Sequence, residues 1–235
     1  MKVDSAGPSG KTFAMNQCIG SVALSLGLFV VAGCSDPADK VHKSAASKPV
    51  KTESAGATNL AVGAKEYVVR TAESKIDFVG SKVTGKHDGG FKNFAGTIQV
   101  ADGKIVGSPE FKINMKTLWA DNAKLTGHLK SADFFDVEKY PSATFVATTI
   151  EPSGDHHNVV GNLDLHGVTK SISFPAKIEI TEDAATINAD FAINRKEFNI
   201  NYPGKTDDLI RDNVALKLAI KASPGALRPE DQITN

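Results

Sequence analysis

The sequence has little net charge, little cysteine and few tyrosines or tryptophans, and each shortage excludes a class of protein. Its 27 Lys and Arg balance 27 Asp and Glu, which argues against a nucleic-acid binder, since such domains are strongly basic. Two Cys in 235 residues exclude a disulfide-stapled mini-protein and a thiolate zinc cluster. A hydrophobic fraction of 41% is too low for a protein with many membrane spans. The composition therefore favours a soluble globular domain.

Catalytic motifs are also missing. The chain contains no GxSxG, Walker A, HExxH or GxGxxG pattern, so we expect no enzymatic activity, no catalytic residue, no metal and no cofactor. One enzyme alternative stays open at this point, because barrel strands can bring distant residues together. It is a metal-dependent enzyme whose metal is held by His87, His128 and His166.

The amino end has the pattern of a bacterial lipoprotein precursor. Lysines at positions 2 and 11 precede an apolar stretch over 19–31, which is shorter than the roughly 20 residues that a spanning helix needs. Val31-Ala32-Gly33-Cys34 resembles the lipobox, in which the cysteine is acylated and becomes the mature amino terminus. We therefore expect a signal peptide over residues 1–33, lipidation of Cys34 by palmitate-like chains, and a periplasm-facing, membrane-anchored protein of the cell envelope. The alternatives are an uncleaved anchor and an ordinary signal peptide with a chance cysteine.

Residues 34–63 are rich in Ser, Ala, Lys, Thr and Pro and lack aromatic residues. A segment of this composition buries too little apolar surface to offset the entropy of ordering it. The sequence therefore predicts a flexible tether between Cys34 and a folded domain over 64–223, with a short carboxy-terminal tail over 224–235.

The dominant hydrophobic period of the domain is two. Apolar and polar residues alternate over 172–180, 187–194 and 214–221, which is typical of strands with one buried face. Turn residues such as Asp102-Gly103 and His166-Gly167 separate the runs. We predict an all-β fold, an eight-stranded antiparallel barrel, because closure removes exposed edges. Over 115–140 the alternation gives way to helical spacing, which predicts one or two short helices across one end, with Asp133 as a helix cap.

An outer-membrane barrel would show the same alternation. Outer-membrane barrels carry girdles of Tyr and Trp at the membrane interfaces, whereas this sequence has twelve Phe but only three Tyr and one Trp. The helical insertion also interrupts the strand series. Both features favour a soluble barrel.

Four blocks of sequence resemble the YceI-like family. They are GGFKNFAGTI at 89–98, GHLKSADFFD with KYPSATF at 127–145, VGNLDLHGVTK at 160–170 and KEFNI at 196–200. The resemblance covers residues 66–222 and implies a lipocalin-like barrel whose apolar lumen holds a long isoprenoid or other lipid chain. The resemblance does not imply an enzymatic activity. Related barrels can pair, so a homodimer is left open.

The expected ligand-binding side chains are apolar and inward-facing. They are Phe78, Phe91, Phe94, Phe111, Leu118, Leu125, Leu129, Phe134, Phe145, Leu163, Phe174, Phe191 and Leu216. Candidate headgroup contacts are His128, Asp133, Lys170 and Arg195, for each of which a structural role is the competing interpretation; Arg195 could instead pair with Glu197 or Asp190. The competing function is a non-enzymatic envelope interaction module whose barrel is filled with side chains.

Overall fold

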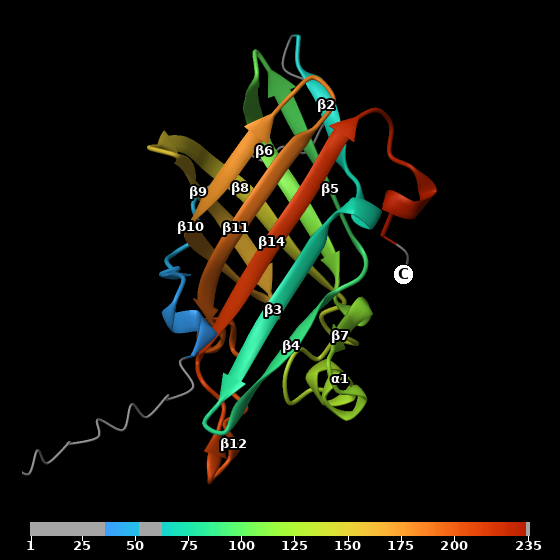
Figure 1. Cartoon of the computed structure of the whole chain (residues 1–235). Helices are drawn as coiled ribbons and strands as arrows, with labels where there is room; N and C mark the ends of the chain where they lie inside the picture. Colours follow the sequence, from blue (N-terminus) through green and yellow to red (C-terminus); the bar gives the residue numbers. More distant parts are fainter. Residues whose placement is uncertain (1–35, 52–62, 234–235) are drawn as a thin grey trace, which may run out of the picture. The chain divides into compact units, whose positions relative to one another are not determined.

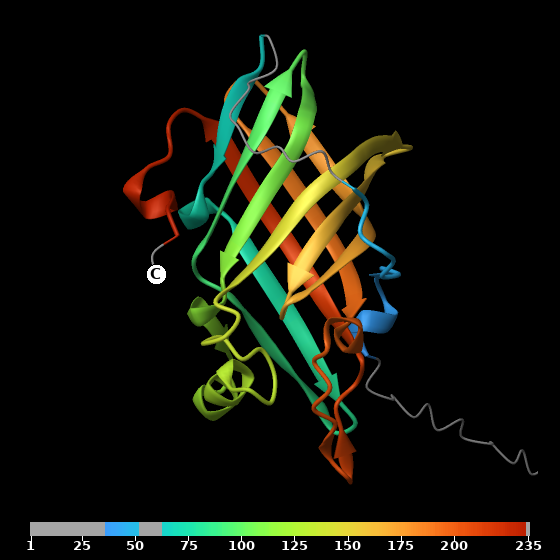
Figure 2. The ribbon, with the colours of Figure 1, turned by 180° about the vertical axis from the view of Figure 1, so that it is seen from behind.

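The strands predicted from apolar–polar alternation close into a ring. The structure, a computed structural model, describes residues 36–51 and 63–233. Each strand pairs antiparallel with the next, and the β11–β14 pairing completes the ring, as Figures 1 and 2 show from opposite sides. This confirms the predicted all-β, eight-stranded antiparallel barrel. In chain order the ring strands are β2 (Lys65–Val69), β5 (Phe94–Ala101), β6 (Lys104–Asn114), β8 (Ser142–Ser153), β9 (His156–Leu165), β10 (Val168–Ile180), β11 (Ala185–Asn194) and β14 (Asn213–Pro224).

Two of the connecting turns lie where the sequence places them. Asp102 and Gly103 join β5 to β6 with φ of 49° and 70°, and His166 and Gly167 join β9 to β10 with φ of 54° and 72°. Two successive positive φ values match the right-handed twist of the strands that they join. The turn chemistry therefore fixes the register of these hairpins.

Three further strands continue the same sheet outside the ring. β3 (Lys75–Lys82) follows β2 through the short 3₁₀ helix η2 (Thr71–Glu73) and pairs with the same strand, β14. β4 (Gly85–Phe91) pairs with β3, and β7 (Leu118–Ala120) pairs with β4. These strands widen one end of the barrel.

The helical insertion lies at this wider end (Figure 1). It contains η3 (Met115–Thr117), β7 and the single α-helix of the described residues, α1 (Ala123–Lys130). Asn122 caps α1, because its Oδ1 accepts from the Leu125 N–H at 3.1 Å. The prediction that Asp133 caps a helix is wrong, since Asp133 follows α1 and contacts His128 instead.

The opposite end of the barrel is closed by side chains. Tyr67 crosses from β2 to the β10–β11 turn, where its hydroxyl lies 2.9 Å from the Thr181 carbonyl and 3.1 Å from that of Glu182. Ile98, Val100, Ala185 and Ala222 are buried beside it. We call this group the closed-end cluster.

Residues 36–51 differ from the predicted tether, because they lie against the barrel wall. They contain η1 (Pro37–Asp39) and β1 (His42–Lys43), and β1 pairs in parallel with β11. Ser47 exchanges backbone hydrogen bonds with Ser171, and the Val50 backbone with the Asn162 side chain. Backbone pairing can hold a segment whose side chains are too small and polar to form a core. Residues 34–35 and 52–62 of the predicted tether lie outside the described residues, as does the whole predicted signal peptide.

The remaining short elements are loops at the two ends. η4 (Arg195–Phe198), β12 (Gly204–Lys205) and β13 (Asp208–Leu209) form the β11–β14 connection at the wider end, and η5 (Pro229–Asp231) follows β14. No helix in the described part of the chain is long and apolar enough to cross a membrane.

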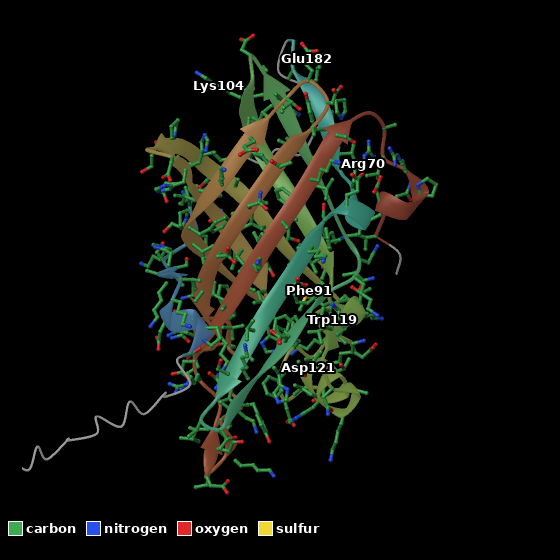
Figure 3. All side chains as sticks on the ribbon, viewed as in Figure 1. Arg70, Phe91, Lys104, Trp119, Asp121 and Glu182 are labelled. Carbon is green, nitrogen blue, oxygen red and sulfur yellow. The ribbon has the colours of Figure 1, made fainter. Side chains whose placement is uncertain are left out.

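The carboxy-terminal tail is held by a buried ion pair. Arg70 Nη1 lies 2.7 Å from Asp231 Oδ2, with both side chains almost wholly buried, and the Thr71 N–H donates to Asp231 Oδ1. Arg70 also donates to Ser223 Oγ at 2.6 Å. The pair therefore joins η5 to η2 and β14, and Figure 3 shows Arg70 beside the red segment that follows β14.

Replacing Asp231 with Ala should lower the free energy of unfolding by about 3–5 kcal/mol, because Arg70 would keep its charge in a buried site without its partner. Chemical denaturation measures the loss. Glu151→Ala, on the exposed side of β8, is the matched control and should change stability by less than about 0.5 kcal/mol. Equal stability of the two variants would contradict the role of the pair.

Candidate functional site

A cavity of about 670 Å³ lies inside the barrel, between the closed-end cluster and the wider end. Its wall is almost entirely apolar and comes from six ring strands, β3, β4 and α1. Along β14 the lining runs from Val214 to Ile220, which is about 20 Å at ~3.3 Å per residue. The cavity is therefore long relative to its width.

Eleven of the thirteen side chains expected in the lumen line this cavity. They are Phe78, Phe91, Phe111, Leu125, Leu129, Phe134, Phe145, Leu163, Phe174, Phe191 and Leu216. They come from β3, β4, β6, β8, β9, β10, β11, β14, α1 and the loop after α1.

Phe94 and Leu118 do not line the cavity, so their expected placement is wrong. Phe94 packs with Ile76 and Ile98 in a separate buried cluster, and Leu118, 1% exposed on β7, pairs with Phe91. Alternation shows which face of a strand is buried, but it does not show which inward side chains are covered by others and which border open space.

Three glycines let phenylalanine rings lie flat along the wall. A Cβ atom on Gly89 would lie 2.3 Å from Phe78 Cζ, and one on Gly161 would lie 2.3 Å from Phe145 Cζ. Gly96 stands in the same relation to Phe111. Since each ring occupies the space of an absent side chain, it does not project across the lumen. These three pairs help to keep the barrel hollow.

A continuous aromatic surface follows from the Gly161 contact. The Phe145 ring reaches over β9 to within 5.6 Å of the Phe174 ring, centroid to centroid. Phe174 stacks on Phe191, with centroids 4.2 Å apart and planes at 5°. Offset stacking favours this arrangement beyond simple area burial. One side of the cavity is therefore a smooth apolar wall.

The mouth of the cavity lies at the wider end and is polar. Lys82 Nζ contacts Asp208 Oδ2 at 2.5 Å, and Thr84 donates to Asp208 Oδ1 from both its N–H and its hydroxyl. The Lys82 contact holds the pKa of Asp208 below its usual range, with a further contribution from Thr84. The Asp208 carboxylate therefore stays ionised at neutral pH. Lys82, Thr84 and Asp208, which we call the mouth latch, join the β3–β4 turn to β13.

Two of the four headgroup candidates line the cavity. His128 does so from α1, with its Nε2 3.0 Å from Asp133 Oδ2 and its ring edge-on to Phe134 and Tyr202. Asp133 does not line the cavity itself. Lys170 lies away from it, with Nζ 3.7 Å from Glu197 Oε2.

Arg195 lines the cavity, but its donors bind the chain. The guanidinium donates to the carbonyls of Arg211, Ile200 and Ile210. Its nearest carboxylate is Asp212 at 3.7 Å, and not Glu197 or Asp190. Burial lowers the pKa of Arg195, and Asp212 opposes the shift. Arg195 therefore holds the β11–β14 connection against the barrel while keeping its charge.

The three histidines of the metal hypothesis have separate partners. His87 Nδ1 contacts Asp121 Oδ1 at 2.9 Å, which holds the pKa of Asp121 below its usual range. His166 Nδ1 lies 3.1 Å from the Phe198 carbonyl, and His128 contacts Asp133. Within residues 36–51 and 63–233, no three metal-ligating side chains come together.

Some cavity residues were not predicted from sequence. Ile200, Tyr202 and Ile210 line the mouth from the β11–β14 connection, which has no periodic pattern to reveal them. Ile178 and Ile187 line the deep end. They lie on strands whose alternation the sequence shows, but the residues expected in the lumen on these strands are Phe174 and Phe191 alone.

The fold and the cavity together define a class: a closed lipocalin-like antiparallel barrel with an apolar lumen that opens at one end. Within this class the chain belongs to the YceI-like domain family, whose model matches residues 67–222. The resemblance seen in the four sequence blocks is thereby confirmed.

Relatives and solved structures agree with this assignment. A UPF0312 protein of Pseudomonas putida is 35% identical over 138 residues, covering 55% of this chain and 71% of the relative. Protein YceI of Escherichia coli O157:H7 is 36% identical over 127 residues, covering 51% and 64%. BcnA of Burkholderia cenocepacia superposes with a TM-score of 0.60 at 25% identity, covering 66% of this chain and 99% of BcnA. A polyisoprenoid binding domain from Saccharophagus degradans shares the fold at 17% identity, with a TM-score of 0.57 and coverage of 69% and 99%.

Replacing Gly161 with Ala should displace the Phe145 ring into the lumen. Overpacking of this kind costs about 1–3 kcal/mol of stability, and uptake of an apolar fluorescent dye such as anilinonaphthalene sulfonate should fall. Denaturation and dye titration measure the two effects.

The matched control is Gly80→Ala, because Gly80 also lines the cavity and a Cβ there meets no atom within 4 Å. It should leave both quantities nearly unchanged. Adding Phe145→Leu to Gly161→Ala should restore dye uptake. If Gly161→Ala behaves like Gly80→Ala, the ring does not depend on the glycine.

Proposed function

We propose that the protein is a membrane-anchored envelope lipoprotein that binds a long-chain isoprenoid or other lipid in the barrel cavity, as a carrier or a store. The observation that carries this proposal is the long apolar cavity, closed at one end and open at the other. Its volume of about 670 Å³ falls within the ~300–1,000 Å³ range of small-molecule sites.

The chemistry of the wall favours a chain over a compact polar molecule. Polar side chains gather at the mouth, while the deep part is lined by Ile105, Ile150, Ile178 and Ile187. Each buried methylene contributes about 0.8 kcal/mol, so a chain of roughly fifteen carbons gains about 12 kcal/mol before the cost of association is subtracted. Useful affinity then needs no specific headgroup contact. The binding domain of Saccharophagus degradans, which is described as polyisoprenoid-binding, supports the same ligand class.

The alternatives fit the structure less well. A filled-barrel interaction module needs a solid core, whereas the Phe–Gly pairs leave the lumen open. A metal-dependent enzyme built on His87, His128 and His166 needs these side chains to converge, and each has a different partner. We therefore propose a binding role for the barrel.

The anchor in this proposal is Cys34. Its support is the lipobox-like Val31-Ala32-Gly33-Cys34 after an apolar segment. Several acyl chains on one residue give the stable membrane attachment that a single chain does not. The cavity and the anchor together describe a protein that takes up a lipid at a membrane and shields it from water.

A Cys34→Ser chain should leave the membrane and appear in the soluble envelope fraction. Native mass spectrometry of that fraction, purified without detergent, should show the protein with one long-chain lipid, which denaturing spectra and organic extraction then identify. Continued membrane association would contradict the anchor alone. A barrel that is repeatedly empty would contradict lipid binding alone.

Two isoleucines of β10 provide a matched pair for the same measurement. Ile178 lines the deep end of the cavity, and Ile180, two residues further along, does not. Ile178→Phe should fill the deep end and shift the bound lipids toward shorter chains, while Ile180→Phe should leave their lengths unchanged. Identical lipid profiles would place the chain elsewhere.

A further inference from the structure

The cavity mouth, the amino-terminal segment and two exposed apolar side chains lie at the same end of the barrel. We propose that this end is a membrane-docking surface, on which Val83 and Leu209 enter the headgroup–acyl boundary of a lipid bilayer and turn the cavity mouth toward it. The proposal rests on the proposed lipidation of Cys34, and it adds the orientation in which the barrel sits and the residues that contact the membrane.

The described chain begins at the mouth end. Asp36 is buried, and its Oδ2 lies 3.4 Å from Arg211 Nε. The Arg211 N–H donates to the carbonyl of Ser81, which lines the cavity near the mouth. Cys34 precedes Asp36 by two residues, a distance of at most about 7 Å along the chain. Acyl chains on Cys34 would therefore start near the mouth, since Figures 1 and 2 show the blue segment that contains η1 in the same half of the barrel as β12.

The amino-terminal segment cannot easily bring the anchor to the other end. Ala38 is buried against Ala192 and Ala215, and the Ser44 N–H donates to the Ala192 carbonyl at 2.8 Å. From there the segment continues along the wall to the Ser47–Ser171 pairing. A lipid anchor held in this way fixes the orientation of the barrel as well as its distance from the membrane.

Two apolar side chains project at the same end. Val83 is 61% exposed in the β3–β4 turn, and Leu209 is 50% exposed on β13. The two are adjacent, because the Val83 N–H donates to the Leu209 carbonyl at 3.2 Å. In the described residues only Val50 and Leu227 are comparably exposed large apolar side chains. Val83 lies in its turn, and Leu209 lies at the base of the β12–β13 hairpin, where it pairs with Gly204. These two neighbouring exposed side chains, which we call the tips, suit insertion into a membrane interface.

The charges around the two tips suit an anionic lipid surface. Lys86, Lys124 and Lys205 are exposed near the mouth and form no ion pair with any described residue. Asp207, in the β12–β13 turn, and Asp88, on β4, are the opposing charges, since Asp208 and Asp121 are already paired. Long lysine side chains can place their ammonium groups among lipid phosphates while their methylenes lie against apolar surface.

The mouth latch connects the tips to the cavity. Lys82 and Asp208 both line the mouth and lie next in sequence to Val83 and Leu209. Docking of the tips therefore brings the rim of the cavity to the bilayer, so that a lipid chain passes into the barrel without crossing water.

Single-cysteine reporters in the mature lipoprotein test this directly. The mature chain has no cysteine besides the acylated Cys34, because Cys18 lies in the segment that is removed. Val83→Cys and Leu209→Cys would each be labelled with an environment-sensitive dye, and the protein placed on vesicles of phosphatidylethanolamine and phosphatidylglycerol. We expect a blue shift of the emission, and quenching when brominated lipids replace part of the bilayer.

Matched reporters define the outcome. Leu227→Cys replaces a leucine of similar exposure outside the mouth. Lys104→Cys labels the closed end, because Lys104 (Figure 3) lies at the opposite end of the barrel from β12 (Figure 1). Neither should be quenched. Quenching of the dye at position 104 would overturn the docking surface. So would vesicle-bound protein in which no dye is quenched at any of the four positions. Both results leave the proposed anchor intact. If the unsubstituted protein takes up the dye, Cys34 is not acylated, and the anchor and this inference both fail.

Discussion

Whether an eight-stranded barrel is solid or hollow depends on how its inward side chains lie, because its interior is just wide enough for those side chains to fill it. Phenylalanines that pointed at the axis would close this lumen. Here Phe78, Phe111 and Phe145 lie across glycines on neighbouring strands, so their rings form the wall. The cavity, and every functional statement that follows from it, depends on this contact between an aromatic ring and a missing side chain.

The two ends of the barrel then take different roles. Tyr67 and its neighbours seal one end with buried apolar groups and hydrogen bonds to backbone carbonyls. At the other end the polar groups are largely occupied with one another, as in the contacts of Lys82 with Asp208 and of His128 with Asp133. The apolar wall therefore makes most of the contacts with a bound lipid, and it discriminates between lipids by the length and thickness of the chain more than by the headgroup.

The sequence predicts the barrel well because strand burial has a short, regular period. Apolar alternation locates the long ring strands, and pairs such as His166-Gly167 locate their turns. It does not reveal β4, whose sequence GKHDGGF lacks apolar alternation and pairs with β3 because glycines there accommodate the Phe78 ring.

The site is predicted less completely, for physical reasons that differ from residue to residue. Alternation places Phe94 on the inner face but does not show that its ring packs against Ile76 and Ile98 and does not border the cavity. Ile200 and Ile210 reach the mouth from a loop that has no period. The amino-terminal segment binds through backbone groups, which every sequence possesses, so its composition suggested a tether. The sequence pattern of apolar and polar side chains therefore does not reveal how inward side chains cover one another, which loop residues reach the cavity, or which segments pair through their backbone.

The most direct test of the account is a crystal structure of the protein purified from its own envelope without detergent. The account predicts continuous electron density for one elongated hydrocarbon chain, running from the Lys82–Asp208 contact to Ile178 between flat Phe145 and Phe174 rings. A barrel whose phenylalanines turn inward and leave no space for a chain would contradict it.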